Sequence, residues 1–393
     1  MRLIGFKYLK LQRILTLTLV TTLSSMLFSI TALSLMSFYR DFNAYLGEGG
    51  DVVVVYDRGS RTPFTGLVPV YLAEKISVLN GVLASSPEAI APCIVRGEAV
   101  FLRGVVPEDF AKLNQIVVVE GGMLELSDLN YAIVGRNAAG RLCLNLGDKL
   151  LVLSVLTDRY VELRVKGVFV SYSPIDDEIL APLYVGQWLR GVGYGYVTLI
   201  RFKVDRDAIT PSRILEEIAR EASKPSPPPS ATPSQPQPPG ITPRIVARIK
   251  VEDVSVEEAY DLMRSYMDRY GLTRESLLIL SIMVFLLSGA SIAVASKTII
   301  AQHKSEISIL RSIGASKRLL KMDMLAKLLP WSIVSSSMGF ALAVAILTVI
   351  HGCGYLRILS HTASIQIDPL IVILNFILTA LLISISILRG DLG

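Results

Sequence analysis

The chain has 393 residues, of which 51% are hydrophobic and only 19% are charged, and its mean hydropathy is +0.51. Soluble domains carry about 25% charged residues, so this balance excludes an ordinary soluble enzyme, a disordered chain and a fibrous protein. The net charge of +5 comes from the two ends of the sequence, because residues 40–274 carry 26 Lys and Arg against 29 Asp and Glu. Basic charge beside apolar segments indicates a membrane protein and argues against a nucleic-acid partner.

Four stretches without Asp, Glu, Lys or Arg are long enough to cross a bilayer whose apolar core is about 30 Å thick. They predict transmembrane helices at residues 14–37, 276–296, 331–350 and 369–388. One charged side chain near the centre of such a helix costs about 2.5–3.5 kcal/mol on insertion. The first stretch is longer than the core of a cleavable signal peptide, so we expect it to remain as a helix.

Lys and Arg flank these stretches unevenly, which predicts their orientation. Residues 1–13 contain four bases and no acid, and the 297–330 loop contains seven bases and two acids, whereas the 351–368 loop contains one of each. We therefore expect both termini, including the tail at 389–393, and the 297–330 loop to be cytoplasmic. Residues 38–275 and the short 351–368 loop are then extracytoplasmic.

The expected fold is a polytopic α-helical membrane protein with four transmembrane helices and a large α+β extracytoplasmic domain between helices 1 and 2. Within residues 38–275, helices are predicted at Pro69–Leu79, Pro211–Ala222 and Val256–Tyr270. Apolar runs bounded by turn residues predict strands at Val52–Tyr56, Ile94–Leu102, Ile116–Glu120, Tyr131–Val134, Lys149–Leu156, Val161–Phe169 and Tyr196–Val204. Residues 224–243 hold nine prolines, which favours an exposed Pro-rich linker.

The cytoplasmic loop contains a pattern typical of two short helices joined at a corner. Ile307, Leu310 and Ile313 recur at three-residue spacing and predict a narrow apolar stripe. Gly314 can end the first helix in a left-handed conformation, and Ser316 can cap the second. Such a corner suits a surface that receives a push from a partner, and an amphipathic loop without a partner would show the same pattern.

Several residues of this corner form a recognisable motif: Glu306, Ile307, Ile309, Leu310, Arg311, Ile313, Gly314, Ala315 and Ser316. The motif resembles the signature of the MacB/FtsX-type permeases of ABC transporters. Weaker likenesses to the outer domain of that family lie at Gly50–Val54, Ile133–Ala139, Leu146–Leu150 and Val165–Phe169. The proline tract has no counterpart in the family pattern.

The resemblance implies a permease that is not itself an enzyme. In that family two permease copies or paralogues pair in the lipid bilayer, and separate cytoplasmic ABC ATPase subunits drive them. The contacts with the ATPase would lie at Glu306, Ile307, Leu310, Arg311, Gly314, Ala315 and Ser316. No cofactor is expected on this chain, since it lacks the G-x-x-x-x-G-K-[ST] loop that holds nucleotide phosphates, so ATP would be bound by the partner subunit.

The family resemblance leaves the substrate and the task open. Export of a substrate, extraction of one at the outer face, and FtsX-like activation of an extracellular cell-wall hydrolase all fit it. A membrane-anchored sensor or scaffold is the alternative from another class. Gly289 and Ala293 have the spacing of a close helix contact, and together with the Ser- and Thr-rich first span they favour a dimer seam.

Other candidate sites are weaker. Two histidines and a thiol share the short outer loop: His351, Cys353 and His361. They lack paired metal-ligand spacing, so no metal site is expected. Asp176-Asp177-Glu178 is expected to be a solvated turn rather than a calcium site. Cys93 and Cys143 are expected to be lone buried thiols, with a disulfide between them as the alternative.

Overall fold

The computed structural model describes residues 11–47, 50–60, 62, 64–222, 254–302, 304–352, 357–358, 361–362 and 366–389. The chain divides into two compact units. The membrane unit consists of Met1–Arg40, Gly271–Leu356 and Ala363–Gly393, and the ectodomain consists of Asp41–Tyr270 and Arg357–Thr362. The predicted Pro-rich linker at 224–243 lies outside the described residues.

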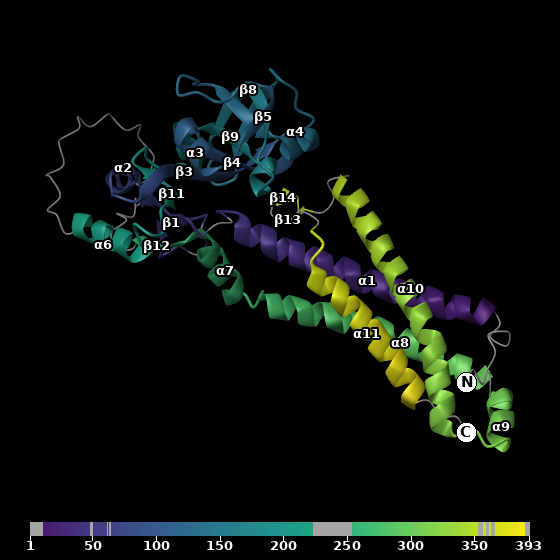
Figure 1. The fold of residues 1–393 in the computed structure, drawn as a ribbon. Helices are drawn as coiled ribbons and strands as arrows, with labels where there is room; N and C mark the ends of the chain where they lie inside the picture. Colours follow the sequence, from purple (N-terminus) through teal and green to yellow (C-terminus); the bar gives the residue numbers. More distant parts are fainter. Residues whose placement is uncertain are drawn as a thin grey trace, which may run out of the picture. The chain divides into compact units, whose positions relative to one another are not determined.

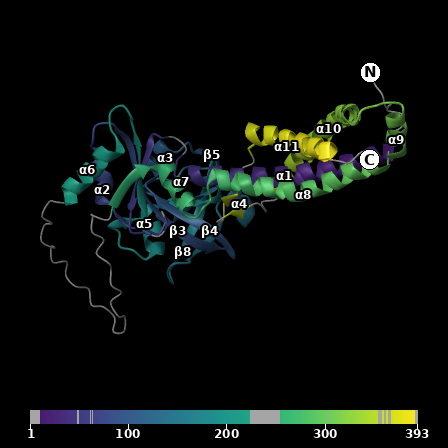
Figure 2. The same cartoon turned by 90° about the horizontal axis from the view of Figure 1, so that it is seen from below.

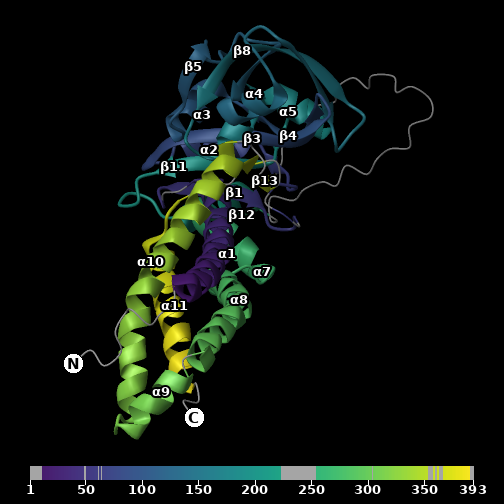
Figure 3. The same cartoon turned by 90° about the vertical axis from the view of Figure 1, so that its right-hand side faces the viewer.

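The membrane unit contains four helices that are long and apolar enough to cross a bilayer, as the sequence predicts. They are α1 (Leu11–Ala44), α8 (Arg274–Gln302), α10 (Lys317–Gly352) and α11 (Pro369–Arg389), and a short α9 (Lys304–Ser312) lies between α8 and α10 (Figure 3). Each long helix extends beyond its predicted apolar stretch. The 36 residues of α10 span about 54 Å, so this helix carries a polar first part in addition to its apolar part. These four helices fit a multi-pass membrane protein.

Helix α1 lies beside the other three long helices (Figure 2), and its hydroxyl groups form hydrogen bonds to them. Ser24 Oγ donates to the carbonyl of Ser288 in α8 at 3.2 Å. Ser25 Oγ lies 3.0 Å from the carbonyl oxygen of Ser336 in α10 and 3.0 Å from Oδ1 of Asn375 in α11. In apolar surroundings such bonds help to set how each helix is rotated against its neighbours, so the Ser- and Thr-rich first span contacts helices of its own chain.

The ectodomain is built on a ten-stranded sheet with the order β12-β1-β11-β3-β4-β9-β6-β8-β5, and β7 pairs with β3 and β8 (Figure 1). Its strands are β1 (Val52–Asp57), β3 (Val82–Val95), β4 (Glu98–Val105), β5 (Val117–Gly121), β6 (Tyr131–Gly135), β7 (Lys149–Ser154), β8 (Tyr160–Val170), β9 (Ile179–Pro182), β11 (Leu199–Val204) and β12 (Val254–Glu258). Two pairs of short strands lie apart from it: β2 (Val68–Pro69) with β10 (Tyr196–Val197), and β13 (Arg357–Ile358) with β14 (His361–Thr362).

The long strand β3 connects two halves of this sheet. Its N-terminal half pairs with β11 and its C-terminal half pairs with β4, and separate hydrophobic cores lie on the two sides of that junction. Short helices complete the halves: α2 (Tyr71–Ser77), α3 (Pro107–Leu113), α4 (Arg136–Leu142), α5 (Leu183–Arg190), α6 (Pro211–Ala222) and α7 (Ala259–Arg269). The ectodomain is therefore the α+β domain expected between the first and second membrane helices.

Three of the predicted elements are wrong in part. The strand predicted at Ile94–Leu102 is a hairpin, because Arg96 and Gly97 both have positive φ, 52° and 83°, as a type I′ turn requires. The strand predicted at Tyr196–Val204 is divided between two sheets, since β10 pairs with β2 and β11 pairs with β1. The helix predicted from Val256 begins only at Ala259, because the preceding residues pair with β1 as an edge strand.

Helix α5 approaches the sheet through two glycines. A Cβ on Gly186 would lie 2.5 Å from the carbonyl oxygen of Ala89 in β3 and 2.8 Å from Cα of Gly104 in β4. These neighbours are backbone atoms, which cannot move aside without breaking the pairing of the strands. Only the absence of both side chains allows this contact.

We expect Gly186→Ala to destabilise the ectodomain by about 1–3 kcal/mol, the cost of forcing extra atoms into a packed interior. The measurement is the thermal midpoint of the full chain in detergent. Gly193→Ala is the matched control, because a Cβ at Gly193 meets nothing within 4 Å. An equal midpoint for the two variants would contradict this account of the packing.

Candidate functional site

The predicted corner between two helices is present at Ile313–Ser316. Gly314 has φ of 101° and ends α9 in a Schellman arrangement. The amide of Ala315 donates to the carbonyl of Leu310 at 3.0 Å, and the amide of Gly314 donates to that of Arg311 at 3.0 Å. These bonds satisfy carbonyls that the end of the helix would otherwise leave unpaired, so the corner has a defined geometry.

The second helix begins with the predicted cap. Oγ of Ser316 accepts a hydrogen bond from the amide of Leu319 at 3.2 Å, which is the N-cap arrangement. Farther along α10, Lys321 Nζ donates to the carbonyl of Leu388 near the end of α11 at 2.6 Å. A cation suits the last turn of a helix, where carbonyl oxygens collect. The corner is thus attached to the membrane unit by this polar contact.

One face of the corner packs against the helix bundle. Ile307 is 2% exposed and packs in a cluster with Leu17, Ile292, Leu320 and Ile383, against which Leu310 and Ala315 also pack. The apolar stripe predicted from the sequence is therefore confirmed at its first two positions. These residues anchor the corner to α1, α8, α10 and α11.

Other side chains of the corner are exposed, and they include both apolar and basic residues. Ile309 is 60% exposed and Ile313 is 78% exposed, and Arg311, Lys317 and Arg318 are also exposed. Ile313, the third position of the predicted stripe, follows the end of α9 at Ser312 and is exposed, so only the first two positions of the stripe pack against the bundle. We call Ile309, Arg311 and Ile313 the corner face.

The predicted coupling residues thus separate by position. Ile307, Leu310 and Ala315 pack inward, Gly314 and Ser316 shape the turn, and Arg311 faces outward. The side chain of Glu306 lies outside the described residues. Ile309 was not among the predicted coupling residues, and the structure shows that it is 60% exposed.

The two residues predicted for a dimer seam have neighbours within the same chain. Gly289 is buried, and a Cβ there would lie 2.5 Å from Cδ1 of Leu382 in α11. The carbonyl of Ala293 accepts a hydrogen bond from Ser386 Oγ at 3.2 Å. The small side chains therefore allow α8 to pack closely on α11, and a role between two copies stays a prediction.

A second group of polar residues is buried at the centre of the ectodomain. Glu88 in β3, Arg103 in β4, Glu178 just before β9 and Arg201 in β11 have side chains at most 2% exposed. Glu88 forms ion pairs with both arginines, at 2.6 Å from Oε1 to Nε of Arg201. We call these four residues the charge cluster.

Glu178 has the largest number of partners in the charge cluster. Its Oε2 accepts from Nε of Arg103 at 2.6 Å, and its Oε1 accepts from Nη2 of the same arginine at 3.0 Å. The hydroxyl of Tyr45 also donates to Glu178, and Nε2 of His361 lies 3.2 Å from Oε1. Tyr45 directly follows α1, and His361 lies in β14, so segments far apart in the sequence meet at this carboxylate.

The environment keeps Glu178 ionised. Burial by itself would raise its pKa, but the charge of Arg103 and hydrogen bonds from His361 and Arg103 outweigh burial and lower the pKa of Glu178 to about 2. Burial strongly raises the pKa of Tyr45, so its phenol remains a donor. Two carboxylates and two guanidinium groups balance each other, which is the condition under which charges can be buried.

The prediction of a solvated turn at Asp176-Asp177-Glu178 is wrong. All three side chains are buried: Asp177 pairs with Arg141 at 3.0 Å, and Asp176 accepts hydrogen bonds from Ser171. The sequence contained a signal for this, because Glu88, Arg103 and Arg201 interrupt apolar runs that form central strands. A charge in such a run needs a buried partner, but the sequence did not identify which acid supplies it.

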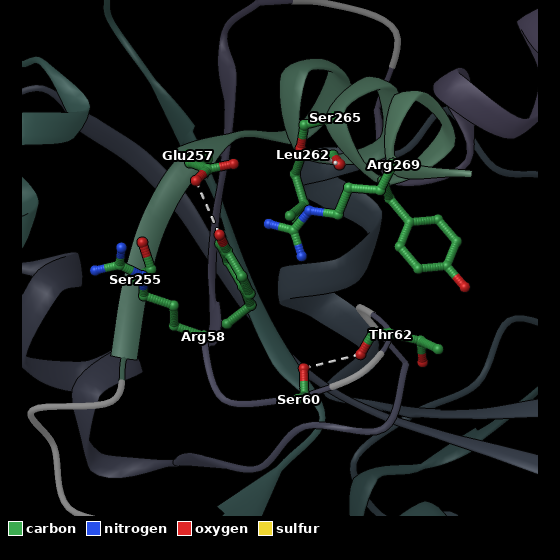
Figure 4. A pocket seen from close by; sticks show the side chains of 10 residues that line it. Arg58, Ser60, Thr62, Ser255, Glu257, Leu262, Ser265 and Arg269 are labelled. Atoms are coloured by element: carbon green, nitrogen blue, oxygen red, sulfur yellow. Dashed lines mark hydrogen bonds between the residues drawn. The ribbon is translucent and has the colours of Figure 1, made fainter. Parts of the chain in front are cut away.

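A pocket of about 300 Å³ lies elsewhere in the ectodomain, between the ends of β1 and β12 and the helix α7 (Figure 4). Ten residues line this pocket: Tyr56, Arg58, Ser60, Thr62, Ser255, Glu257, Leu262, Ser265, Tyr266 and Arg269. The hydroxyl of Tyr56 donates to Glu257 at 2.9 Å. The lining combines two guanidinium groups with one carboxylate, so it favours no single ligand charge.

The cysteines and the outer-loop histidines form no metal site among the residues that the structure describes. Cys93 and Cys143 are both free, so the alternative of a disulfide between them is wrong. Cys93 is buried, as expected, and burial raises the pKa of its thiol to about 12, whereas Cys143 is exposed. Cys353 lies outside the described residues.

Comparison with known proteins identifies a family for the C-terminal membrane helices. Residues 278–389, which include α9, the corner and α11, match the family model for the FtsX-like permease C-terminal domain. No curated protein matches the chain. The periplasmic region of MacB from Actinobacillus actinomycetemcomitans is similar over 56% of this chain and 92% of its own length, with 13% identity and a TM-score of 0.36. The extracellular domain of the noncanonic ABC-type transporter YknZ from Gram-positive bacteria covers 42% of this chain and 88% of its own length, with 14% identity and a TM-score of 0.32.

We expect Gly314→Ala to loosen the corner, because a left-handed conformation costs an L-residue about 1–2 kcal/mol. Hydrogen exchange should become faster at the amides of Gly314 and Ala315, which form the Schellman bonds. Gly314→Asn should have a smaller effect, since Asn tolerates positive φ better than Ala. Gly140→Ala is the control, at a glycine without positive φ or a near neighbour. Unchanged exchange in Gly314→Ala would show that the turn does not depend on glycine.

We expect Glu178→Gln to destabilise the ectodomain at pH 7 by about 3–5 kcal/mol, the cost of removing one partner of a buried pair. The contribution of Glu178 is complete above the pKa of an unfolded glutamate, about 4.3, and is lost as the pH falls towards about 2. The difference in thermal midpoint between wild type and variant should therefore narrow from pH 5 to pH 2.5. Glu216→Gln, at an exposed position of α6, should show no difference at any pH. A gap that stays constant down to pH 2.5 would refute a depressed pKa.

Proposed function

We propose that this chain, whose residues 278–389 belong to the FtsX-like permease family, is the membrane subunit of an ABC transporter. It would relay ATP-driven motion from a separate cytoplasmic ATPase to its extracytoplasmic domain, and so export or extract a substrate at the outer face. The observation that carries the proposal is the corner face, which presents Ile309, Arg311 and Ile313 to solvent within the matched region.

Two properties of the corner support a role in transmitting force. Its inward face is anchored by Ile307 and Leu320 in the hydrophobic cluster of the membrane unit, and its turn is held by the Schellman bonds of Gly314. A force on such a corner would move the attached helices, whereas a flexible loop at this place would deform and transmit little movement. The long α10 begins at this corner, so its first turns would receive the motion directly.

The outward face has the composition of a protein interface. Exposed isoleucines supply apolar area and an arginine supplies a directional donor, and arginine is enriched among the residues that contribute most to binding energy in interfaces. The exposed bases Lys317 and Arg318 would favour an acidic rim on the partner. They also support a cytoplasmic position for this loop, because basic residues are retained on that side of the membrane.

The partner would hydrolyse ATP, and this chain would transmit the resulting movement. The membrane helices contain no Asp, Glu, Lys or Arg within residues 276–296, 331–350 and 369–388. Helices of this kind suit the transmission of movement better than the conduction of an ion. A second copy or a paralogue would complete the membrane assembly.

We expect the double variant Ile309→Ser, Ile313→Ser to weaken association with the ABC ATPase encoded nearest to its gene. Burying an isoleucine contributes about 1.5–3 kcal/mol, so the loss of two should weaken binding more than tenfold in co-purification from detergent. The control is Leu126→Ser, at an equally exposed apolar position of the ectodomain, which should leave the association unchanged.

Three outcomes of this experiment differ in meaning. Loss of the ATPase only in the double variant supports the coupling role of the corner face. Equal recovery of the ATPase with wild type and double variant would contradict that role. Failure of any ATPase to associate with the wild-type chain would contradict the transporter proposal and favour a membrane-anchored sensor or scaffold.

A further inference from the structure

The hairpin formed by β13 and β14 belongs to the ectodomain, although it lies in the sequence between the membrane helices α10 and α11. Arg357 pairs with Thr362, and Ile358 pairs with His361. Residues Arg357–Thr362 group with the ectodomain, and the residues on both sides of them group with the membrane unit. The chain therefore passes between the two units four times, and the hairpin accounts for two of these passages (Figure 1).

The side chain of His361 contacts the ectodomain core. Its ring stacks on Phe101 in β4, with centroids 5.5 Å apart and planes at 23°. It also meets the ring of Tyr45 edge to face, with centroids 5.0 Å apart. Its Nε2 lies 3.2 Å from Oε1 of Glu178, and only 14% of the side chain is exposed. One side chain of the hairpin thus fits between two rings and a carboxylate.

Buried ion pairs and hydrogen bonds hold Glu178, the charged partner of His361, in place. Arg103 holds Glu178 through two bonds, and Arg103 is itself paired with Glu88. Tyr45, which follows the last residue of α1, donates to the same carboxylate. A carboxylate held by a buried arginine cannot turn towards water without breaking several bonds at once. His361 is therefore anchored to a rigid part of the ectodomain.

We propose that the β13–β14 hairpin is a latch, in which the contact of His361 with Glu178 ties the loop between the last two membrane helices to the core of the ectodomain. Motion of α10 and α11 then reaches the sheet through this hairpin, in addition to the chain connections at α1 and α8. The latch itself stands on the geometry of the ectodomain. Its part in transmitting motion rests on the proposed function.

Through the latch, two segments that connect to membrane helices both contact the charge cluster. Tyr45 brings the end of α1 to Glu178, and His361 brings the loop that precedes α11 to the same oxygen atom. A displacement of either segment must disturb the carboxylate that both share. The two segments are thereby coupled to each other as well as to the sheet.

Limited proteolysis of the full chain in detergent tests the latch. Because Arg357 pairs with Thr362, we expect trypsin to cleave after Arg357 mainly when this strand pairing is open, so the rate of cleavage reports how often the hairpin opens. His361→Ala should raise the rate of cleavage after Arg357 at least tenfold, with the fragment ends identified by mass spectrometry. His351→Ala, at the end of α10 in the membrane unit, is the matched control and should leave the rate unchanged.

A second variant separates the specific contact from a general loosening. His361→Gln keeps a side-chain donor for Glu178 and should restore at least part of the protection that His361→Ala loses. Cleavage as slow in His361→Ala as in wild type would overturn the latch. So would equally fast cleavage in His351→Ala, because the contact of His361 would then not be what closes the hairpin.

A separate measurement tests whether the latch transmits motion to the ectodomain. In the complex with the ATPase, His361→Ala should co-purify as well as wild type but lose the nucleotide-dependent change in the tryptic pattern of the ectodomain. A full nucleotide response in His361→Ala would overturn transmission through the hairpin. If no ATPase binds the wild-type chain, the proposed function fails, while the cleavage rates of the chain alone still decide whether the latch exists.

Discussion

The ectodomain is organised around the ion pairs that join Arg103 to Glu88 and Glu178, and Arg201 to Glu88. Removing four charges from water costs several kcal/mol for each ion, and only well-placed partners offset that cost. The four residues come from β3, β4, β11 and the segment before β9, so these strands must hold one relative position for the pairs to form. A shift of one strand by a single residue would turn its charged side chain to the other face of the sheet. The cluster therefore selects the register of the central strands, and Tyr45 and His361 attach two further segments to it.

The membrane unit obeys a different constraint. Its apolar spans contain no Asp, Glu, Lys or Arg, and the helices pack through small residues and hydroxyl groups such as Ser24, Ser25 and Gly289. At one end of this unit the corner at Gly314 has a geometry set by backbone hydrogen bonds. Both the corner and the charge cluster are rigid for local, identifiable reasons, because backbone hydrogen bonds hold the corner and buried ion pairs hold the cluster.

The sequence and the structure agree best where a feature depends on neighbours along the chain. The cap at Ser316, the turn at Gly314 and helix α6 were all predicted from local pattern and are present. The predictions failed where a distant segment decided the outcome. Residues Val254–Glu258 form a strand, and not the start of a helix, because they pair with β1. The strand predicted from Tyr196 is divided because β2 pairs only with its first two residues. At the corner, helical spacing predicted an apolar stripe that includes Ile313, but α9 ends at Ser312 and Ile313 is exposed.

The sequence by itself determined that the chain has four apolar helices with a large α+β domain after the first, and that a corner follows the second. These properties depend on hydrophobicity, charge and glycine or serine at specific positions, and each can be evaluated within a short window of residues. Only the tertiary structure decided that Asp176, Asp177 and Glu178 are buried, and that Glu178 meets His361 from a loop 183 residues away. A run of acidic residues has the same local sequence pattern whether water or an arginine side chain binds its carboxylates. Which of the two does so is settled by strand pairing over long separations, and no local pattern encodes that pairing.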